Sequence, residues 1–218
     1  MSKRSSMLVT AGPTHEAIDA VRFLANRSSG QMGMAIAQAA QDAGWEVTLL
    51  LGPGPSPPKG IRTLDFVSAA DLESLLGEHF PECDVLVMAA AVADYRPRQS
   101  HPGKLPRGEN SLVLELEPTP DLVAHCASRR RPGQRIIAFA LEEQAALEQR
   151  AAEKLHGKGV DAIVANPLET IGADRIRATI LTSDGRRFEP EGRDGADLPM
   201  SKSSFAEWLV GWIGRWSN

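Results

Sequence analysis

The chain has 218 residues, 42% of them hydrophobic and 24% charged, which is enough for one globular domain over residues 1–218 with a buried core. A formal net charge of −4 without a basic stripe argues against a nucleic-acid partner. The sequence contains no apolar segment of signal-peptide or membrane-spanning length, and Cys83 and Cys126 stand far apart without a metal-binding spacing. We therefore expect a cytoplasmic protein with no membrane partner and with both cysteines in its core.

The first half of the chain alternates strand and helix patterns. "SMLVTAG" (residues 6–12) is a short apolar run that ends in a glycine, which is typical of a buried parallel strand. A helix is predicted from near Gly30 to Gly44, with small and apolar residues on one stripe. Further predicted elements are a strand at 45–53, a helix at 69–80 and a strand at 83–92. This alternation predicts a doubly wound, Rossmann-like α/β fold with a mostly parallel sheet.

The second half mixes helix patterns with parallel and antiparallel strand patterns. "SLVLELEP" (111–118) alternates apolar and acidic residues, as a half-exposed strand does. "RATILTSDGRRFEPE" (177–191) reads as an added antiparallel hairpin that turns at Asp184-Gly185. The last helix, from Ser201, carries an aromatic stripe typical of a core or a subunit contact. Other predicted elements are a strand at 135–142, a helix at 143–159, a strand at 161–167 and an active-site lid at 96–110.

The region after the first strand has neither common nucleotide-binding motif. "TAGPTHEAID" lacks the pattern G-x-G-x-x-G, and the phosphate loop G-x-x-x-x-G-K-[ST] is absent from the chain. Instead "SSGQMG" (28–33) stands at the predicted helix start, where backbone N–H groups attract phosphate. The same letters also suit a serine cap with glycine packing. The candidate phosphate-binding residues are Gly12, Ser28, Ser29 and Gly30.

Three charged residues extend this candidate site. Asp94 follows the third predicted strand, and the carboxyl ends of strands in an open parallel sheet face the ligand crevice. It could accept a hydrogen bond from a ribose or a base, or cap the next turn. Lys154 and Lys158 are four residues apart on one helix face, where they could hold a triphosphate. As an alternative, they are surface charges that favour the dipole of the helix.

Five stretches of the chain, taken together, resemble the phosphopantothenoylcysteine synthetases, which are ligases of coenzyme A synthesis and form the C-terminal domain family of the DNA/pantothenate metabolism flavoproteins. The resemblance runs from about Met7 to the C-terminal helix and indicates a stand-alone, bacterial-type version. The stretches are "LVTAGPTHEAIDAVRFLANRSSGQMGMAIA" (8–37), "AAAVADYRP" (89–97), "PTPDLVA" (118–124), "IIAFALE" (136–142) and "KLHGKGVDAIVANPL" (154–168).

The resemblance implies a reaction and a set of ligands. Family members join 4'-phosphopantothenate to L-cysteine with a nucleoside triphosphate and Mg²⁺, through an acyl-nucleotidyl intermediate, and release pyrophosphate. The stretch "AVADYRP" and the flap (residues 104–107) resemble the bacterial members of the family, which suggests CTP as the nucleotide. ATP stays the alternative, because "FALE" is intermediate between the bacterial and the eukaryotic sequences. The resemblance also implies a homodimer, for which residues 111–118 are the candidate surface, and allows a separate phosphopantothenoylcysteine decarboxylase as a partner.

The resemblance assigns roles to individual residues. Asn26 matches the asparagine that holds the intermediate, and Lys104 matches the first lysine of the flap motif K-I-K-K. The flap here reads "KLPR" (104–107), which departs from the family at its last two positions. The metal ligands stay unassigned. The implied nucleotide-binding residues are Asp94, Pro120, Asp121, Leu122, Val123, Phe139, Lys154 and Lys158.

Two other functions remain to be distinguished. A short-chain NAD(P)-dependent oxidoreductase needs a glycine fingerprint and a Y-x-x-x-K pair, but the single tyrosine, Tyr95, has no lysine four residues later. A non-catalytic nucleotide-binding module would bind CTP and release no pyrophosphate when it is given phosphopantothenate.

Overall fold

A computed structural model describes residues 4–54, 56–170, 172–190 and 199–216 of the chain. An eight-stranded sheet lies at its centre, in the order β13-β12-β10-β9-β6-β1-β4-β5. Its strands are β1 (Ser6–Ala11), β4 (Glu46–Leu51), β5 (Arg62–Asp65), β6 (Val85–Met88), β9 (Arg135–Glu142), β10 (Ala162–Pro167), β12 (Thr179–Thr182) and β13 (Arg187–Phe188).

The sheet is parallel from β10 to β5 and antiparallel at its other edge, where β12 pairs with β10 and β13 pairs with β12. The hairpin between β12 and β13 contains the predicted turn, in which Gly185 adopts a φ of 82°. This topology confirms the Rossmann-like, mostly parallel fold with an added antiparallel hairpin.

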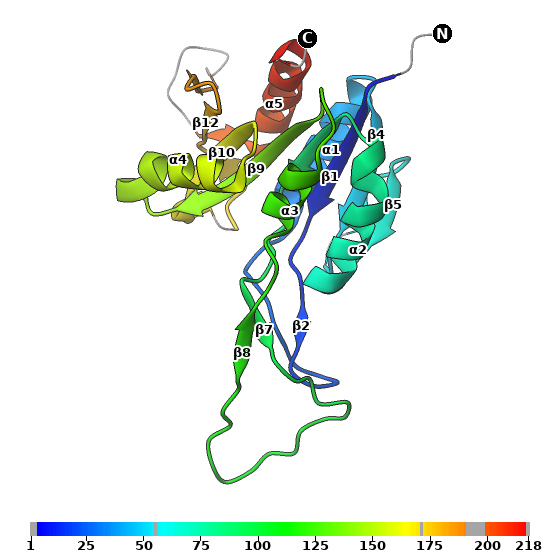
Figure 1. Cartoon of the computed structure of the whole chain (residues 1–218), viewed down its shortest axis with the longest axis vertical. Coiled ribbons are helices and arrows are strands. Elements are labelled where there is room, and N and C mark those ends of the chain that lie inside the picture. Colours follow the sequence, from blue (N-terminus) through cyan, green and yellow to red (C-terminus); the bar gives the residue numbers. More distant parts are fainter. Residues whose placement is uncertain (1–3, 55, 171, 191–198, 217–218) are drawn as a thin grey trace.

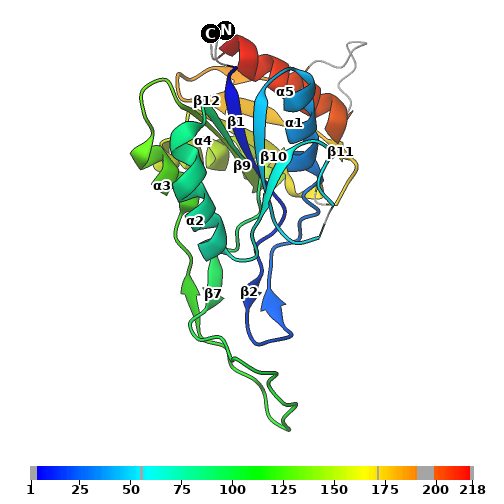
Figure 2. The same cartoon turned by 90° about the vertical axis from the view of Figure 1, so that its right-hand side faces the viewer.

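Helices cover both faces of the sheet (Figures 1 and 2). α1 (Gln31–Asp42) and α5 (Lys202–Trp216) pack on one face, whereas α2 (Ala69–His79), α3 (Leu122–Arg129) and α4 (Leu147–Lys158) pack on the other. Phe205 and Trp212 of the aromatic stripe are buried between α5 and the rest of the first layer, and Trp208 and Trp216 pack against the same cluster. The stripe therefore belongs to the core of this chain, which was one of the two predicted roles.

Shorter elements complete the fold. The 3₁₀ turns are η1 (Phe80–Glu82), η2 (Gln144–Ala146) and η3 (Leu168–Thr170), and the two-stranded pairs are β2 (Glu16–Ala17) with β3 (Phe23–Leu24), β7 (Tyr95–Pro97) with β8 (Leu116–Pro118), and β11 (Arg175–Ile176) with β14 (Met200–Ser201). We call residues 95–118 the arm, since in both views this segment projects from the body beside the β2–β3 hairpin (Figures 1 and 2).

Two predicted strands are shorter than expected. Of residues 111–118 only the last three form a strand, β8, because only these lie opposite β7. The strand predicted at 83–92 spans only β6, because its regular pairing with β1 ends at Thr10 and Met88 and resumes only as one isolated bridge, between Pro13 and Ala91. Beyond β6 the chain bonds to other acceptors: the N–H of Ala90 donates to Oγ1 of Thr10, at 3.0 Å.

A glycine at the start of α1 allows this helix to lie close to β1. A Cβ atom at Gly33 would stand 2.6 Å from the Cβ of Ala11 and 2.8 Å from the carbonyl oxygen of Thr10. Gly33→Ala is therefore expected to lower the free energy of unfolding, because an overpacking cost of about 1–3 kcal/mol exceeds the helix-propensity gain of about 1 kcal/mol. Gly77→Ala in α2 is the matched control, since its Cβ meets open space, and it should raise stability in the same urea titration. Equal effects of the two substitutions would contradict the close approach.

The cysteines lie in the core, as expected. Both are free thiols, and burial raises the pKa of Cys83 to about 11 and that of Cys126 to about 12. We expect neither thiol to react with a disulfide reagent at pH 8 in the native protein, because both are buried and both pKa values lie well above 8. Both should react promptly in 6 M guanidinium, and rapid native labelling would contradict this burial.

Candidate active site

A cavity of about 830 Å³ opens at the carboxyl ends of β6, β9 and β10. The chain runs outward from β1 through β4 to β5 and then crosses back to β6, so the strand order reverses between β1 and β6. Ligands of open α/β sheets bind at such a reversal. The start of α1, the segment after β6, the start of α3 and the last turns of α4 line the cavity.

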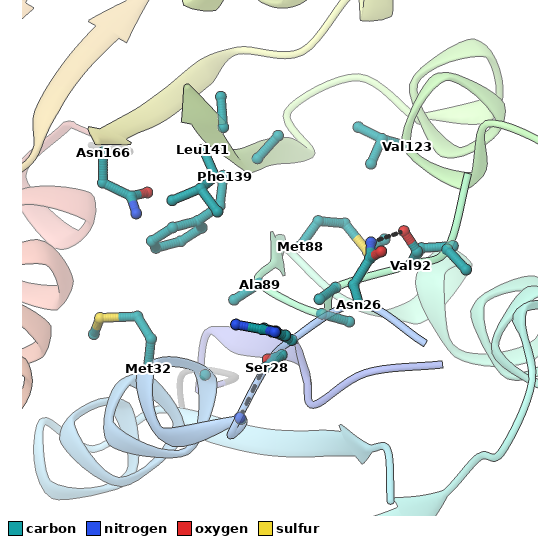
Figure 3. Close-up of a pocket in the computed structure, with 18 of the residues that line it drawn as sticks. Asn26, Ser28, Met32, Met88, Ala89, Val92, Val123, Phe139, Leu141 and Asn166 are labelled. Atoms are coloured by element: carbon teal, nitrogen blue, oxygen red, sulfur yellow. Dashed lines mark hydrogen bonds between the residues drawn. The ribbon is translucent and has the colours of Figure 1, made fainter. Parts of the chain in front are cut away.

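The amino-terminal end of α1 faces this cavity without a side-chain cap. Gly30 is the N-cap residue, with a φ of 68°, and as a glycine it has no side chain that could accept a hydrogen bond from the first turn of the helix. The Ser28 hydroxyl accepts instead from the N–H of Gly30, at 3.3 Å (Figure 3). α2, by contrast, has a complete capping box built on Ser68. The uncapped N–H groups of α1, on Gln31 and the two residues after it, are thus available to an anion.

Asn26 lies at the rim of the cavity and is held by one hydrogen bond. Its Nδ2 donates to the carbonyl oxygen of Val92 at 2.9 Å, which joins the segment before α1 to the segment after β6 (Figure 3). The side chain is exposed. The bond therefore orients an amide at the cavity without burying it.

Two lysines of α4 also line the cavity, and each has a carboxylate partner. Nζ of Lys154 stands 2.5 Å from Oε1 of Glu142, and Nζ of Lys158 donates to Oδ2 of Asp121 at 2.6 Å. Partial burial acts to raise the pKa of Asp121, but the hydrogen bonds from Lys158 and from the N–H of Ala124 outweigh it and lower the pKa. Both ammonium groups thus lie beside the cavity in ion pairs with carboxylates.

Most of the other predicted nucleotide-binding residues also line the cavity. Phe139 extends into it from β9 (Figure 3), and the cavity wall includes Ser28, Ser29, Asp94, Pro120, Asp121, Leu122 and Val123. Asp121 has a further role that the sequence analysis missed: it caps α3, a helix that was not predicted.

Two predicted site residues do not line the cavity, and neither does the tyrosine that the alternative oxidoreductase function would use. Gly12 forms the turn at the end of β1, where a Cβ would stand 3.1 Å from Cα of Gly52. Lys104 is exposed in the arm. Tyr95, the tyrosine that an oxidoreductase of the short-chain type would need, is 56% exposed and also lies outside the cavity.

Lys202 and Asn166 are among the polar residues that line the cavity and that the sequence analysis did not identify. Lys202, at the start of α5, donates from Nζ to Oε1 of Gln31 at 3.2 Å and thereby reaches the uncapped end of α1. Burial lowers its pKa, and Asp174 offsets only part of that effect. No local pattern marks Lys202. Asn166, whose Nδ2 donates to Oγ1 of Thr170 at 2.7 Å, ends a buried parallel strand, and that position was a usable signal.

The fold and the cavity together define a Rossmann-like domain with a ligand-sized cavity at its topological switch. The family model for the DNA/pantothenate metabolism flavoprotein C-terminal domain matches residues 2–214, and the chain belongs to this family. Within the described ranges, no helix has both the length and the apolar character that crossing a membrane requires.

Two relatives and one solved structure are similar to the chain. A "Cysteine/Cysteine sulfinic acid decarboxylase" from an unknown prokaryotic organism is 42% identical over 202 residues, which cover 88% of this chain and 56% of the relative. The "Coenzyme A biosynthesis bifunctional protein CoaBC" of Bacillus subtilis (strain 168) is 36% identical over 189 residues, covering 84% and 46%. The chain thus spans about half the length of these relatives. The crystal structure of a CoaBC C-terminal domain superposes with a TM-score of 0.80 at 35% identity, covering 97% of this chain and 95% of that one.

Proposed function

We propose that this chain joins 4'-phosphopantothenate to L-cysteine and cleaves CTP to CMP and pyrophosphate. One observation carries the proposal: the uncapped end of α1 and two lysines of α4 line the same cavity, whose volume of about 830 Å³ suits a nucleotide with a second substrate. The family membership and the similarity to the CoaBC C-terminal domain support the same reaction.

The proposed chemistry has two steps. The phosphopantothenate carboxylate attacks the α-phosphorus of CTP, and pyrophosphate leaves. The cysteine amine then attacks the acyl carbon, loses a proton, and CMP leaves with the C–O bond electrons. The side-chain amide of Asn26 donates a hydrogen bond to the carbonyl oxygen of the acyl-cytidylate. This bond stabilises the negative charge that develops on that oxygen when the amine attacks. Lys154 and Lys158 exchange their carboxylate partners for triphosphate oxygens.

Mg²⁺ fits this site as part of the bound nucleotide. Among the described residues no group of three or more His, Cys, Asp or Glu side chains could hold a metal ion. Mg²⁺ commonly binds through substrate phosphates with one or two protein carboxylates rather than in an all-protein cage. Asp94, which is exposed at the cavity, is the carboxylate that we assign to this role.

A pyrophosphate-release assay with phosphopantothenate, comparing CTP with ATP at equal concentration, tests the proposal. Release that depends on phosphopantothenate supports the ligase. A strong preference for ATP would overturn the choice of CTP and leave the reaction intact, whereas nucleotide binding without release would identify a binding module. Because one relative is named as a decarboxylase of cysteine, the assay should also measure CO₂ release from cysteine alone. Such release in place of pyrophosphate release would refute the ligase.

We also propose a homodimer formed through the arm. Leu112, Val113 and Leu116 of the arm are 58%, 87% and 44% exposed, and a second copy would cover these apolar side chains. Sedimentation of the parent and of Val113→Asp tests this contact, with a dimer and a monomer as the expected results. A separate phosphopantothenoylcysteine decarboxylase would consume the product, and co-sedimentation tests whether it binds.

A further inference from the structure

The peptide group between Val92 and Ala93 is hydrogen-bonded at both of its ends. Its carbonyl oxygen accepts from Nδ2 of Asn26 at 2.9 Å, beside the cavity (Figure 3). Its N–H donates to Oγ1 of Thr14 at 3.0 Å, in a buried contact between residues 79 apart in the sequence. Because a trans peptide unit is planar, its C=O and N–H point in opposite directions. The peptide group therefore lies between Asn26 at the cavity and Thr14 in the interior.

Thr14 is bonded to the peptide groups on both sides of Val92. While its hydroxyl accepts from the N–H of Ala93, its own N–H donates to the carbonyl of Ala91 at 3.2 Å. The Thr14 side chain is completely buried, and Ala93 is buried as well, so the hydroxyl serves this N–H in place of water. The two bonds fix the backbone of Val92 from the side that faces away from Asn26.

The segment that carries Thr14 is itself held in place. The carbonyl of Gly12 accepts from the N–H of Ala91 at 2.9 Å, and the N–H of His15 donates to the carbonyl of Val67 at 2.7 Å. Residues 11–17 do not line the cavity. The segment that stands where a dinucleotide-binding motif would be expected therefore supports the chain after β6 and contributes no wall of its own.

The direction of the Asn26 amide depends on this peptide group. The bond to Val92 is the one side-chain hydrogen bond that Asn26 makes within the described part of the chain. A side-chain amide nitrogen carries two donor protons, so one is used by Val92 and the other is available to a ligand in the cavity. A rotation of the Val92–Ala93 peptide would turn the acceptor and, with it, the second donor. The hydrogen bond at the N–H also polarises the carbonyl and strengthens its bond to Asn26.

We propose that Thr14 is a positioning residue of the site: its buried hydroxyl fixes the Val92–Ala93 peptide, whose carbonyl orients the amide of Asn26 toward the acyl-cytidylate. This inference rests on the proposed function for the role of Asn26. Thr14 itself touches no substrate and acts on Asn26 through a single peptide group.

Amide exchange and the NMR signals of the Asn26 side chain test this role without catalysis. Thr14→Val keeps the shape of the side chain and removes the acceptor, so the Ala93 amide should exchange about tenfold faster. The Nδ2 proton that is bonded to Val92 should move upfield, and loss of the signal in Asn26→Ala identifies it. Thr14→Ser keeps the hydroxyl and should restore both values. An unchanged Asn26 signal in Thr14→Val would overturn the proposal.

Thr182→Val is the matched control for a general loss of stability. The Thr182 side chain is 1% exposed, and its hydroxyl bonds to Asp184 and to the carbonyl of Arg186 in the β12–β13 hairpin, outside the cavity wall. The substitution should lower the melting temperature and leave the Asn26 signal at its parent position. An equal shift of that signal in Thr182→Val and Thr14→Val would report a general loss of order and would overturn the positioning role.

Pyrophosphate release tests the consequence for the reaction. With phosphopantothenate, cysteine and CTP present, Thr14→Val should lower kcat about tenfold with little change in the KM for CTP, whereas Thr14→Ser and Thr182→Val should stay near the parent. The double variant Thr14→Val/Asn26→Ala should be no slower than Asn26→Ala alone, because the peptide then has no amide to orient. Multiplicative losses would show that Thr14 does not act through Asn26 and would overturn the inference. Absence of pyrophosphate release by the parent protein would refute the proposed function instead, and the Asn26 signal would still decide whether Thr14 orients this amide.

Discussion

Asn26→Ala is expected to lower the overall rate of product formation about 10²–10³-fold, because one preorganised donor that holds the acyl-cytidylate, and that stabilises the charge on its carbonyl oxygen during amine attack, is lost. Binding of CTP should change little, since Lys154, Lys158 and the uncapped end of α1 remain. With cysteine withheld, the parent protein should accumulate the acyl-cytidylate, and the variant should not. Mass spectrometry of the quenched mixture measures both.

A purely structural role for Asn26 predicts a different result. Its bond to Val92 would then be worth about 1 kcal/mol of stability, and the intermediate would accumulate equally in both proteins. Thermal unfolding of the variant separates the two cases, because Asn26 is exposed and its loss leaves no buried group without a partner. Asn26→Asp is a useful companion, since it keeps the shape of the side chain and replaces the donor by a negative charge.

Lys154→Met is expected to weaken nucleotide binding at least about tenfold and to lower stability as well. The substitution removes a positive charge from the cavity and leaves Glu142, whose side chain is only 7% exposed, with Arg150 at 3.6 Å as its remaining cation. A carboxylate left in this position would also repel a triphosphate. Removing one member of such a pair costs more than the pair contributes. Calorimetric titration with a non-hydrolysable CTP analogue and urea unfolding measure the two effects.

The double variant Lys154→Met/Glu142→Gln separates charge from structure. Its stability should return toward that of the parent, because no buried charge remains, whereas nucleotide affinity should recover only in part. Lys158 provides a comparison within the same helix, since its partner Asp121 is 46% exposed. Lys158→Met should therefore cost less stability than Lys154→Met. Full recovery of affinity in the double variant would show that Lys154 does not contact the phosphates.

Much of the sheet could be predicted because its strands are long apolar runs with clear ends. The run "RIIAFALE" coincides with β9. The hairpin turn at Asp184-Gly185 could be predicted because glycine readily adopts the positive φ that such a turn needs. Strand ends that depend on a neighbour could not be predicted, as β6 and β8 show. α3 was missed because its eight residues give only about two turns of pattern.

The candidate site was predictable where a local pattern or the family resemblance marks it. Spacing singled out the two lysines of α4, and the small residues before α1 suggested a phosphate-binding helix start, with a serine cap as the alternative. Lys202 could not be found in this way, because it reaches Gln31 only through the packing of α5 on α1, across 171 residues of sequence. For Lys104 the sequence and the structure differ. The family motif predicts that it binds the phosphates, whereas the next residue, Leu105, is hydrogen-bonded to the β2–β3 hairpin and Lys104 does not line the cavity.

The two outer strands of the large sheet limit how this chain can aggregate. β5 has four residues and carries charges at both ends, Arg62 and Asp65. β13 has two residues, and its Arg187 forms ion pairs with Glu148 and Glu189 across the edge. Short, charged outer strands are poor templates for the backbone of another chain. Pairing between the sheets of two molecules is therefore disfavoured at both outer strands. An ordered fibre of this protein could form only after these outer strands had unfolded.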